Sequence, residues 1–147
     1  MHYLDTSVLL VYTLAQALEK ERYVHVSRLF ELVKSGKIKV ITSFYALHEL
    51  FIIAIQNAPD LETGSKFGKE ALNKILDTRI ILVPLLDRED RILHAQKFSS
   101  LNDASDIPHA ISAVVYNCED IIAYDDHFRA IKDVIPYLAP EDAIKKW

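Results

Sequence analysis

The chain is poor in several residues that mark particular classes of protein. A single cysteine among 147 residues, Cys118, excludes an internal disulfide and favours a reducing compartment, so we expect a cytoplasmic protein. Only 3 glycines occur, while 50% of the residues are hydrophobic, which indicates a compact, helix-rich chain rather than a disordered one. The length fits one domain over residues 1–147.

No sequence feature points to a membrane or to export. No apolar run approaches the roughly 18 residues that a membrane span needs. We also expect no secretory signal peptide, because the carboxylate of Asp5 follows a strand-like start at the beginning of the chain. The formal net charge of -4 argues against a general nucleic-acid coat, although an acidic site with a local basic rim stays compatible with it.

Several motifs of nucleotide and ester chemistry are missing as well. The chain contains neither GxGxxG nor GxxxxGK(S/T), so neither type of phosphate-binding loop is present. The absence of GxSxG disfavours an α/β-hydrolase. The 6 histidines show no HxH or HxxxH spacing, which disfavours a zinc site.

Short apolar segments alternate with helical segments along the chain, without an internal repeat or a linker. We expect strands at residues 2–5, 38–42, 80–84, 120–124 and 134–138, and helices at residues 17–35, 44–57, 61–77, 87–101, 107–118 and 126–132. Ser43 and Asp87 are the expected N-caps of two of these helices. Short, fully apolar strands between helices predict an α/β fold with a parallel sheet that is covered on both faces.

Four acids occur where these segments join. Asp5 follows the first strand, Asp125 follows the strand at residues 120–124, Glu49 lies on the helix after residues 38–42, and Asp106 opens another helix. Because ligands collect beyond the carboxyl ends of parallel strands, all four acids could reach one end of the sheet. Clustered carboxylates repel one another, and a proton or a cation relieves the repulsion. Oxygen ligands of this kind suit Mg²⁺ or Mn²⁺, so the sequence predicts a metal site.

Each of these acids also has an ordinary structural interpretation. The helix around Glu49 is apolar nearly all round, so this carboxylate needs a partner or a metal, unless it faces solvent beside His48 or pairs with a lysine or arginine. Asp106 or Ser105 could be a helix N-cap, with Pro108 in the first turn. A cap and a metal ligand are compatible roles, since one carboxylate has several acceptor positions.

The remaining polar candidates lie close to these acids in the sequence. Of Asp125 and Asp126, we expect one to cap the following helix and the other to point into the cleft at the strand ends. Asp103 is interpreted as a loop or capping residue that could assist the site. Thr6 and Ser7 could cap the first helix or hold a water or a phosphate. Cys118 is in register with the apolar stripe of its helix and is interpreted as a buried core residue rather than a nucleophile.

Four segments together resemble the PIN domain, and most closely the VapC-type ribonuclease toxins and their prokaryotic relatives. The segments are YLDTSVLL at residues 3–10, SFYALHEL at 43–50, DIPHAISA at 106–113 and IIAYDDHF at 121–128. They span almost the whole chain in the order and spacing of that family. Any one of them is a weak signal, whereas four in order are a strong one.

The resemblance implies a three-layer α/β/α sandwich with a central parallel sheet, and metal-dependent cleavage of RNA. It makes Asp5, Glu49, Asp106 and Asp125 the catalytic and metal-binding acids, with Mg²⁺ or Mn²⁺ as cofactor. The family often has a threonine two residues before its last acid, where this chain has Ala123. The missing hydroxyl leaves Asp126 open as an alternative to Asp125.

The resemblance also implies an RNA substrate, a homodimer and, for a toxin, an antitoxin partner. Arg129, Lys132 and the pair Lys37 and Lys39 are candidate RNA contacts, with ordinary surface charge as the alternative. The residues do not separate a toxin from a housekeeping ribonuclease.

Two other classes of protein share parts of this pattern. A non-catalytic PIN-like scaffold that binds RNA or protein has no need of four clustered acids. A receiver-like phospho-acceptor domain would need an acidic pair after its first strand and a lysine after its last. Here only Asp5 follows the first strand, and no lysine directly follows residues 120–124.

Overall fold

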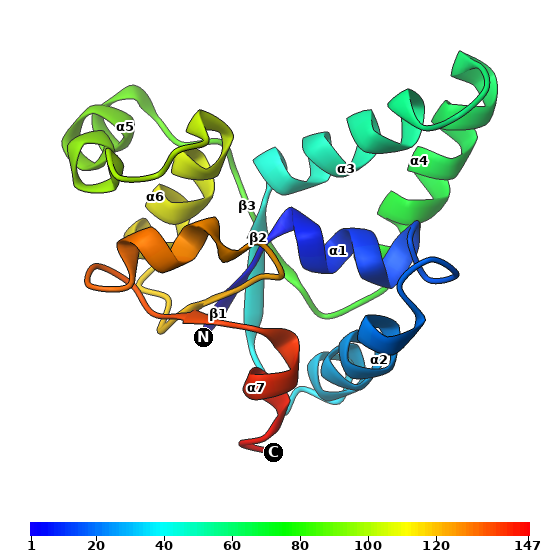
Figure 1. The fold of residues 1–147 in the computed structure, drawn as a ribbon, viewed down its shortest axis with the longest axis horizontal. Helices are drawn as coiled ribbons and strands as arrows, with labels where there is room; N and C mark the ends of the chain where they lie inside the picture. Colours follow the sequence, from blue (N-terminus) through cyan, green and yellow to red (C-terminus); the bar gives the residue numbers. More distant parts are fainter.

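The computed structural model describes residues 1–147 and contains a central sheet of five parallel strands between two layers of helices (Figure 1). The strand order is β3-β2-β1-β4-β5, and every neighbouring pair is parallel. The strands are β1 His2–Leu4, β2 Val40–Ser43, β3 Ile81–Val83, β4 Ile121–Ile122 and β5 Tyr137–Leu138. This architecture confirms the predicted α/β/α sandwich and the five predicted strands.

Alternating strand residues build two separate cores, one on each face of the sheet. Successive side chains of a strand point to opposite faces. Leu4 and Ile122 pack into one core with residues of the helices α1 (Thr6–Thr13) and α2 (Lys20–Lys34). Tyr3 and Ile121 pack into the other core with residues of α6 (Ile107–Val115). Both faces are therefore apolar, which explains why the strands read as continuous hydrophobic runs.

The helices follow the predicted pattern except near the start of the chain, where residues 6–13 form a helix outside the predicted ranges. They are α1 Thr6–Thr13, α2 Lys20–Lys34, α3 Phe44–Gln56, α4 Leu61–Leu76, α5 Arg88–Ala95, α6 Ile107–Val115 and α7 Pro140–Ile144. Three short 3₁₀ segments accompany them: η1 Gln96–Phe98, η2 Ala104–Asp106 and η3 Asp126–Ile131. Ser43 caps α3 and Asp87 caps α5, as the sequence predicts. None of the helices is both long and apolar enough to cross a bilayer.

The end of α6 differs from the prediction, and with it the setting of Cys118. Asn117 adopts a left-handed conformation with φ 53°, and the N–H of Cys118 donates to the carbonyl of Ala113, which ends the helix in a Schellman-type turn. Cys118 therefore lies beyond the helix and is half-buried rather than on its apolar stripe. Burial raises the pKa of the Cys118 thiol to about 12, so the thiol stays protonated and is a poor nucleophile.

Three further segments differ from the prediction. The helix predicted for residues 87–101 ends as α5 at Ala95 and continues as a 3₁₀ turn, and residues 126–131 form a 3₁₀ segment rather than an α-helix. The short helix α7 was not predicted; of its five residues, only Pro140 and Ala143 are buried.

Helices α3 and α4 lie side by side as a hairpin (Figure 1), and their close approach depends on two glycines. A Cβ at Gly64 would lie 2.7 Å from Cα of Ile55, and a Cβ at Gly68 would lie 2.5 Å from Cδ2 of Phe51. The Ile55 atom belongs to the backbone of α3, so it cannot move aside as a side chain could. Gly64 therefore fixes the distance between the two helices.

We expect Gly64→Ala to lower the free energy of unfolding by about 1–3 kcal/mol, because the added methyl group forces α4 away from α3. Urea unfolding followed by circular dichroism measures the change. Lys66→Ala, at an exposed position of the same helix, is the matched control and should change stability little. Equal stability of the wild type and Gly64→Ala would contradict this account of the hairpin.

Candidate active site

All four acids predicted from the sequence line one pocket of about 660 Å³ at the carboxyl ends of β1, β2 and β4. Its lining consists of Asp5, Thr6, Ser7, Leu10, His48, Glu49, Ile52, Ile53, Gln56, Asp103, Ser105, Asp106 and Asp125. A second cavity of similar size lies between α1, α3 and α4, but its lining is mostly apolar, with Glu70 and Lys74 as its charged residues. The titratable groups with metal-ligand chemistry are therefore in the first pocket.

Asp5 is held at the junction of β1 and α1. Its Oδ2 accepts hydrogen bonds from the N–H of Ser7 at 2.9 Å and from the Ser7 hydroxyl at 2.6 Å, so the side chain caps α1. The Ser7 hydroxyl also accepts from the N–H of Tyr124 at 2.9 Å, which ties this cap to the segment after β4. Asp5 is 5% exposed and lines the pocket, and it is Asp5, rather than Thr6 or Ser7, that caps α1.

Glu49 lies in the second turn of α3 and is 33% exposed at its side chain. Its Oε2 accepts from Nε2 of His109 at 3.0 Å and from the Thr6 hydroxyl. Burial alone would raise the pKa of Glu49, but the hydrogen bond and charge of His109, with the hydrogen bond from Thr6, outweigh it and lower the pKa. The ionisable partner of Glu49 is therefore a histidine, not the lysine or arginine considered from the sequence.

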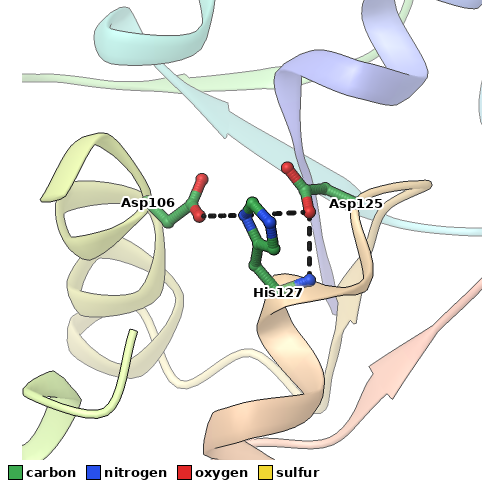
Figure 2. Close-up of side chains that lie close together, drawn as sticks. All are labelled: Asp106, Asp125 and His127. Carbon is green, nitrogen blue, oxygen red and sulfur yellow. Dashed lines mark hydrogen bonds and ion pairs between the residues drawn. The ribbon is translucent and has the colours of Figure 1, made fainter. Parts of the chain in front are cut away.

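Asp106 and Asp125 approach each other from η2 and from the end of β4, with His127 between them (Figure 2). Nδ1 of His127 lies 3.3 Å from Oδ2 of Asp106 and 3.2 Å from Oδ1 of Asp125. Asp106 is 8% exposed, and its backbone occupies the N-cap position of α6, but its side chain makes no capping hydrogen bond. One ligand atom from each of these three residues lies within 4.8 Å of the other two, so together they could hold a metal ion.

The pKa values in this group reflect crowding of negative charge. Burial, and then the charges of Asp125 and Asp5, raise the pKa of Asp106 to about 6. The charge of Asp125 and the hydrogen bond to Asp106 raise the pKa of His127. Below about pH 6, a proton on Asp106 relieves the repulsion in metal-free protein, which is the alternative to a cation.

Each of the four acids uses one oxygen for its own support and leaves the other without a protein hydrogen bond. The supported oxygens are Oδ2 of Asp5, Oε2 of Glu49, Oδ2 of Asp106 and Oδ1 of Asp125. The opposite oxygens are Oδ1 of Asp5, Oε1 of Glu49, Oδ1 of Asp106 and Oδ2 of Asp125. The ligand atoms of Asp106 and Asp125 lie within 4.8 Å of each other and of His127, whereas Asp5 and Glu49 line the same pocket outside that close group. Carboxylate oxygens that lack protein donors suit a hard divalent cation.

The division of roles between Asp125 and Asp126 was predicted wrongly. Asp125 performs both, because its Oδ1 accepts from the N–H of His127 and caps η3 while its side chain also lines the pocket. Asp126 is exposed and outside the pocket lining. Asp103 lines the pocket but is exposed, and its Oδ1 caps η2 through Ser105, in keeping with a capping residue.

The candidate RNA contacts fall on different sides of the molecule. Lys37 and Lys39 are exposed at the amino end of β2, where the N–H of His2 donates to the carbonyl of Lys39, and this end is opposite to the acidic pocket. They are therefore too remote to contact RNA at the acids. Arg129 and Lys132 are exposed in and just after η3, the segment that Asp125 caps, and they remain candidates.

Two histidines of the site were not found from the sequence. His109 is buried and contacts Glu49, and His127 contacts Asp106 and Asp125. Local spacing offered a signal for His109, which follows Asp106 by three positions on one helix face.

Comparison with known proteins defines the fold class. No protein-family model matches the sequence, and no curated protein matches it. Solved structures do match: the chain has the PIN-domain fold of VapC toxins, which confirms the fold that the four sequence segments indicated.

Three of these structures have a TM-score of 0.65 each. VapC20 of Mycobacterium tuberculosis, a toxin that cleaves the sarcin-ricin loop, is 15% identical over 88% of this chain and 94% of its own. VapBC2 of Rickettsia felis, bound to a DNA fragment from its promoter, is 19% identical over 95% of this chain and 98% of its own. FitAcB of Neisseria gonorrhoeae is 21% identical over the same shares. At such identities the likeness concerns the fold.

Proposed function

We propose that the protein is a divalent-metal-dependent endoribonuclease and the toxin of a toxin–antitoxin pair. The observation that carries the proposal is the set of four carboxylates with one free oxygen each in a single pocket. The fold adds support, since it is shared with a toxin that cleaves the sarcin-ricin loop.

The donor set fits Mg²⁺ or Mn²⁺. Asp5, Glu49, Asp106 and Asp125 offer only oxygen atoms, which hard divalent ions prefer, and Asp106 keeps a raised pKa that a nearby cation would relieve. A bound ion would lower the pKa of a water molecule and neutralise negative charge in the transition state of phosphodiester hydrolysis.

The chain's own residues hold and orient the reacting groups. Asp5 and Glu49 are fixed from α1 and α3 by Ser7, Thr6 and His109, so their free oxygens have defined positions. Asp106 and Asp125 are the acids that we propose to orient the attacking water, whose oxygen bonds to phosphorus as the bond to the leaving oxygen breaks. Geometric control of this kind is a large part of catalysis in phosphoryl transfer.

Arg129 and Lys132 are the proposed RNA contacts. A pocket with several carboxylates repels the phosphates of RNA unless cations offset the charge. Both side chains are exposed near the segment that follows Asp125, and the guanidinium of Arg129 lies 5.9 Å from the ring centre of Tyr137.

The experiment uses protein purified free of any partner and incubated with single-stranded RNA and Mg²⁺ or Mn²⁺. We expect cleavage that EDTA abolishes and that Asp5→Asn reduces by about 100-fold or more, because one charged ligand is lost. Asp126→Asn removes an exposed carboxylate next to the site and is the control that should cleave like the wild type. Equal cleavage by wild type and Asp5→Asn would indicate a contaminating nuclease and contradict the proposal.

A non-catalytic scaffold is the competing function, and metal titration separates the two. The scaffold predicts no divalent binding at millimolar concentration, whereas the nuclease predicts saturable binding. The free oxygens of the four acids favour the nuclease.

The toxin role and an antitoxin partner depend on the fold comparison rather than on any one residue. An adjoining small antitoxin-like gene and arrested growth on overexpression would support this role. Their absence together would restrict the proposal to a housekeeping ribonuclease. The homodimer implied by the resemblance stays a prediction that the single chain does not test.

A further inference from the structure

A buried hydrogen-bonded chain links Glu49 at the candidate metal site to Tyr3 and Ser43 in the central sheet. His109 is 1% exposed, and its Nε2 donates to Oε2 of Glu49 at 3.0 Å, since a carboxylate can only accept. On the other side of the ring, Nδ1 lies 2.7 Å from the Tyr3 hydroxyl, which lies 2.7 Å from the Ser43 hydroxyl. Ser43 in turn caps α3, the helix that carries Glu49.

We propose that His109 is a positioning residue of the metal site, which holds the carboxylate of Glu49 in one orientation and leaves its Oε1 free for a divalent ion. This inference rests on the proposed metal-dependent function. His109 itself contacts neither the ion nor the substrate, because its two ring nitrogens are occupied by Glu49 and Tyr3.

The hydrogen bonds to Glu49 are one-sided, which is the first argument. Both protein donors, His109 and the Thr6 hydroxyl, bond to Oε2, and Oε1 has no protein donor. A glutamate side chain that is one-third exposed would otherwise sample several rotamers, and ordering it on metal binding costs conformational entropy. The two donors select one orientation before the ion arrives.

The position of His109 on its helix is the second argument. It follows Asp106 by three residues, so the two side chains share one face of the start of α6. Asp106 belongs to one part of the proposed site and Glu49 to another, on separate helices. Through His109, α6 therefore fixes the distance between these two acids.

The third argument is that a polar histidine is buried beside the core that contains Tyr3 and Ile121. Three of its neighbours in the chain, Ala110, Ile111 and Ala113, are fully or almost fully buried, so an apolar side chain would suit this environment. Instead the site holds an imidazole that bonds to Glu49 at the pocket and to the Tyr3 hydroxyl, which in turn bonds to Ser43 on β2. Such outer partners of ligands orient them and strengthen metal binding.

The test is calorimetric titration of the intact protein with Mn²⁺ alone, without RNA. We expect His109→Leu to weaken Mn²⁺ binding by about 10- to 100-fold, which is the usual effect of removing an outer partner of a ligand. His109→Gln should recover most of the affinity, because its amide nitrogen can reach Glu49. His109→Asn should not, because its shorter side chain reaches only toward Tyr3. Equal Mn²⁺ affinity in the wild type, His109→Leu and His109→Asn would overturn the inference.

A second comparison separates positioning from a general loss of structure. In a Glu49→Gln background, His109→Leu should cause no further loss of Mn²⁺ affinity, since the carboxylate that it orients is absent. A full additional loss in that background would mean that His109 acts through the fold, and would overturn the inference. If His109→Leu does not fold in a thermal unfolding test, His109→Asn against His109→Gln carries the same comparison. A wild type that binds no Mn²⁺ would instead contradict the proposed function itself.

Discussion

Asp106→Asn is expected to abolish RNA cleavage and, at the same time, to stabilise the metal-free protein. Cleavage should fall by about 10²- to 10³-fold, because a charged ligand beside the reacting phosphate is lost. The stability gain follows from the pKa of about 6, which is raised from 3.8 first by burial and then by the charges of Asp125 and Asp5. A shift of that size is worth up to about 3 kcal/mol at pH 7, so we expect a gain of about 1–3 kcal/mol.

The sign of the pH dependence follows from the direction of this shift. The pKa of Asp106 is higher in the folded protein than in the unfolded chain, so its contribution to stability is full below pH 3.8 and is lost as the pH rises through about 6. The advantage of Asp106→Asn should therefore be small at pH 4 and largest above pH 6. Urea unfolding in EDTA measures it, with Asp126→Asn as the control. An Asp106→Asn variant that is less stable than wild type at pH 7 would contradict the prediction.

Divalent-ion affinity is the second quantity with a large expected change, and it should fall about tenfold for each pH unit below about 6. The ion needs the ionised form of Asp106, so a proton must leave this carboxyl group when the ion binds. Calorimetric titration with Mn²⁺ at several pH values gives the affinity. Repeating it in buffers with different ionisation enthalpies counts the protons released.

The control for the second prediction is the Asp106→Asn variant itself. Any Mn²⁺ binding that it retains should depend less on pH between 5 and 6 than binding by the wild type. A wild-type affinity that is constant over this range, with no proton released, would show that Asp106 is not a ligand. Such a result would leave Asp5, Glu49 and Asp125 as the remaining candidates.

The parallel sheet, and the position of the four acids around one pocket, could be predicted because both follow from local patterns. Short apolar strands between amphipathic helices define a sheet with two covered faces, and the acids stand just after strands or at helix starts. In such a sheet the carboxyl ends of neighbouring parallel strands lie next to each other at the same end of the sheet. Asp5 and Asp125 follow β1 and β4, which are hydrogen-bonded neighbours.

The histidine partners could not be predicted, because they depend on contacts between distant parts of the chain. His109 bonds to Glu49 across 60 positions, and His127 bonds to Asp106 across 21. Spacing along one helix shows that His109 shares a face with Asp106, but it does not show what lies opposite. The packing of α6 against α3 decides that.

The two roles of Asp125 illustrate a different limit of sequence reasoning. From the sequence we expect one of the two adjacent acids to cap the following helix and the other to point into the cleft. The structure gives both tasks to one carboxylate, whose Oδ1 accepts from the N–H of His127 while Oδ2 has no protein donor. A carboxylate has two oxygens, so one aspartate can cap a helix with the first and face the pocket with the second.

Because one oxygen of each acid is held by a protein group, the arrangement of the four acids does not depend on a bound ion. Ser7, His109 and His127 hold Asp5, Glu49 and the pair Asp106 and Asp125 through contacts that exist without a metal. The site is thus preorganised, and the entropy of arranging the ligands is spent during folding rather than during binding. If the proposed metal site is occupied, we expect an ion to leave and return without rebuilding its surroundings, so the fold should not depend on the metal.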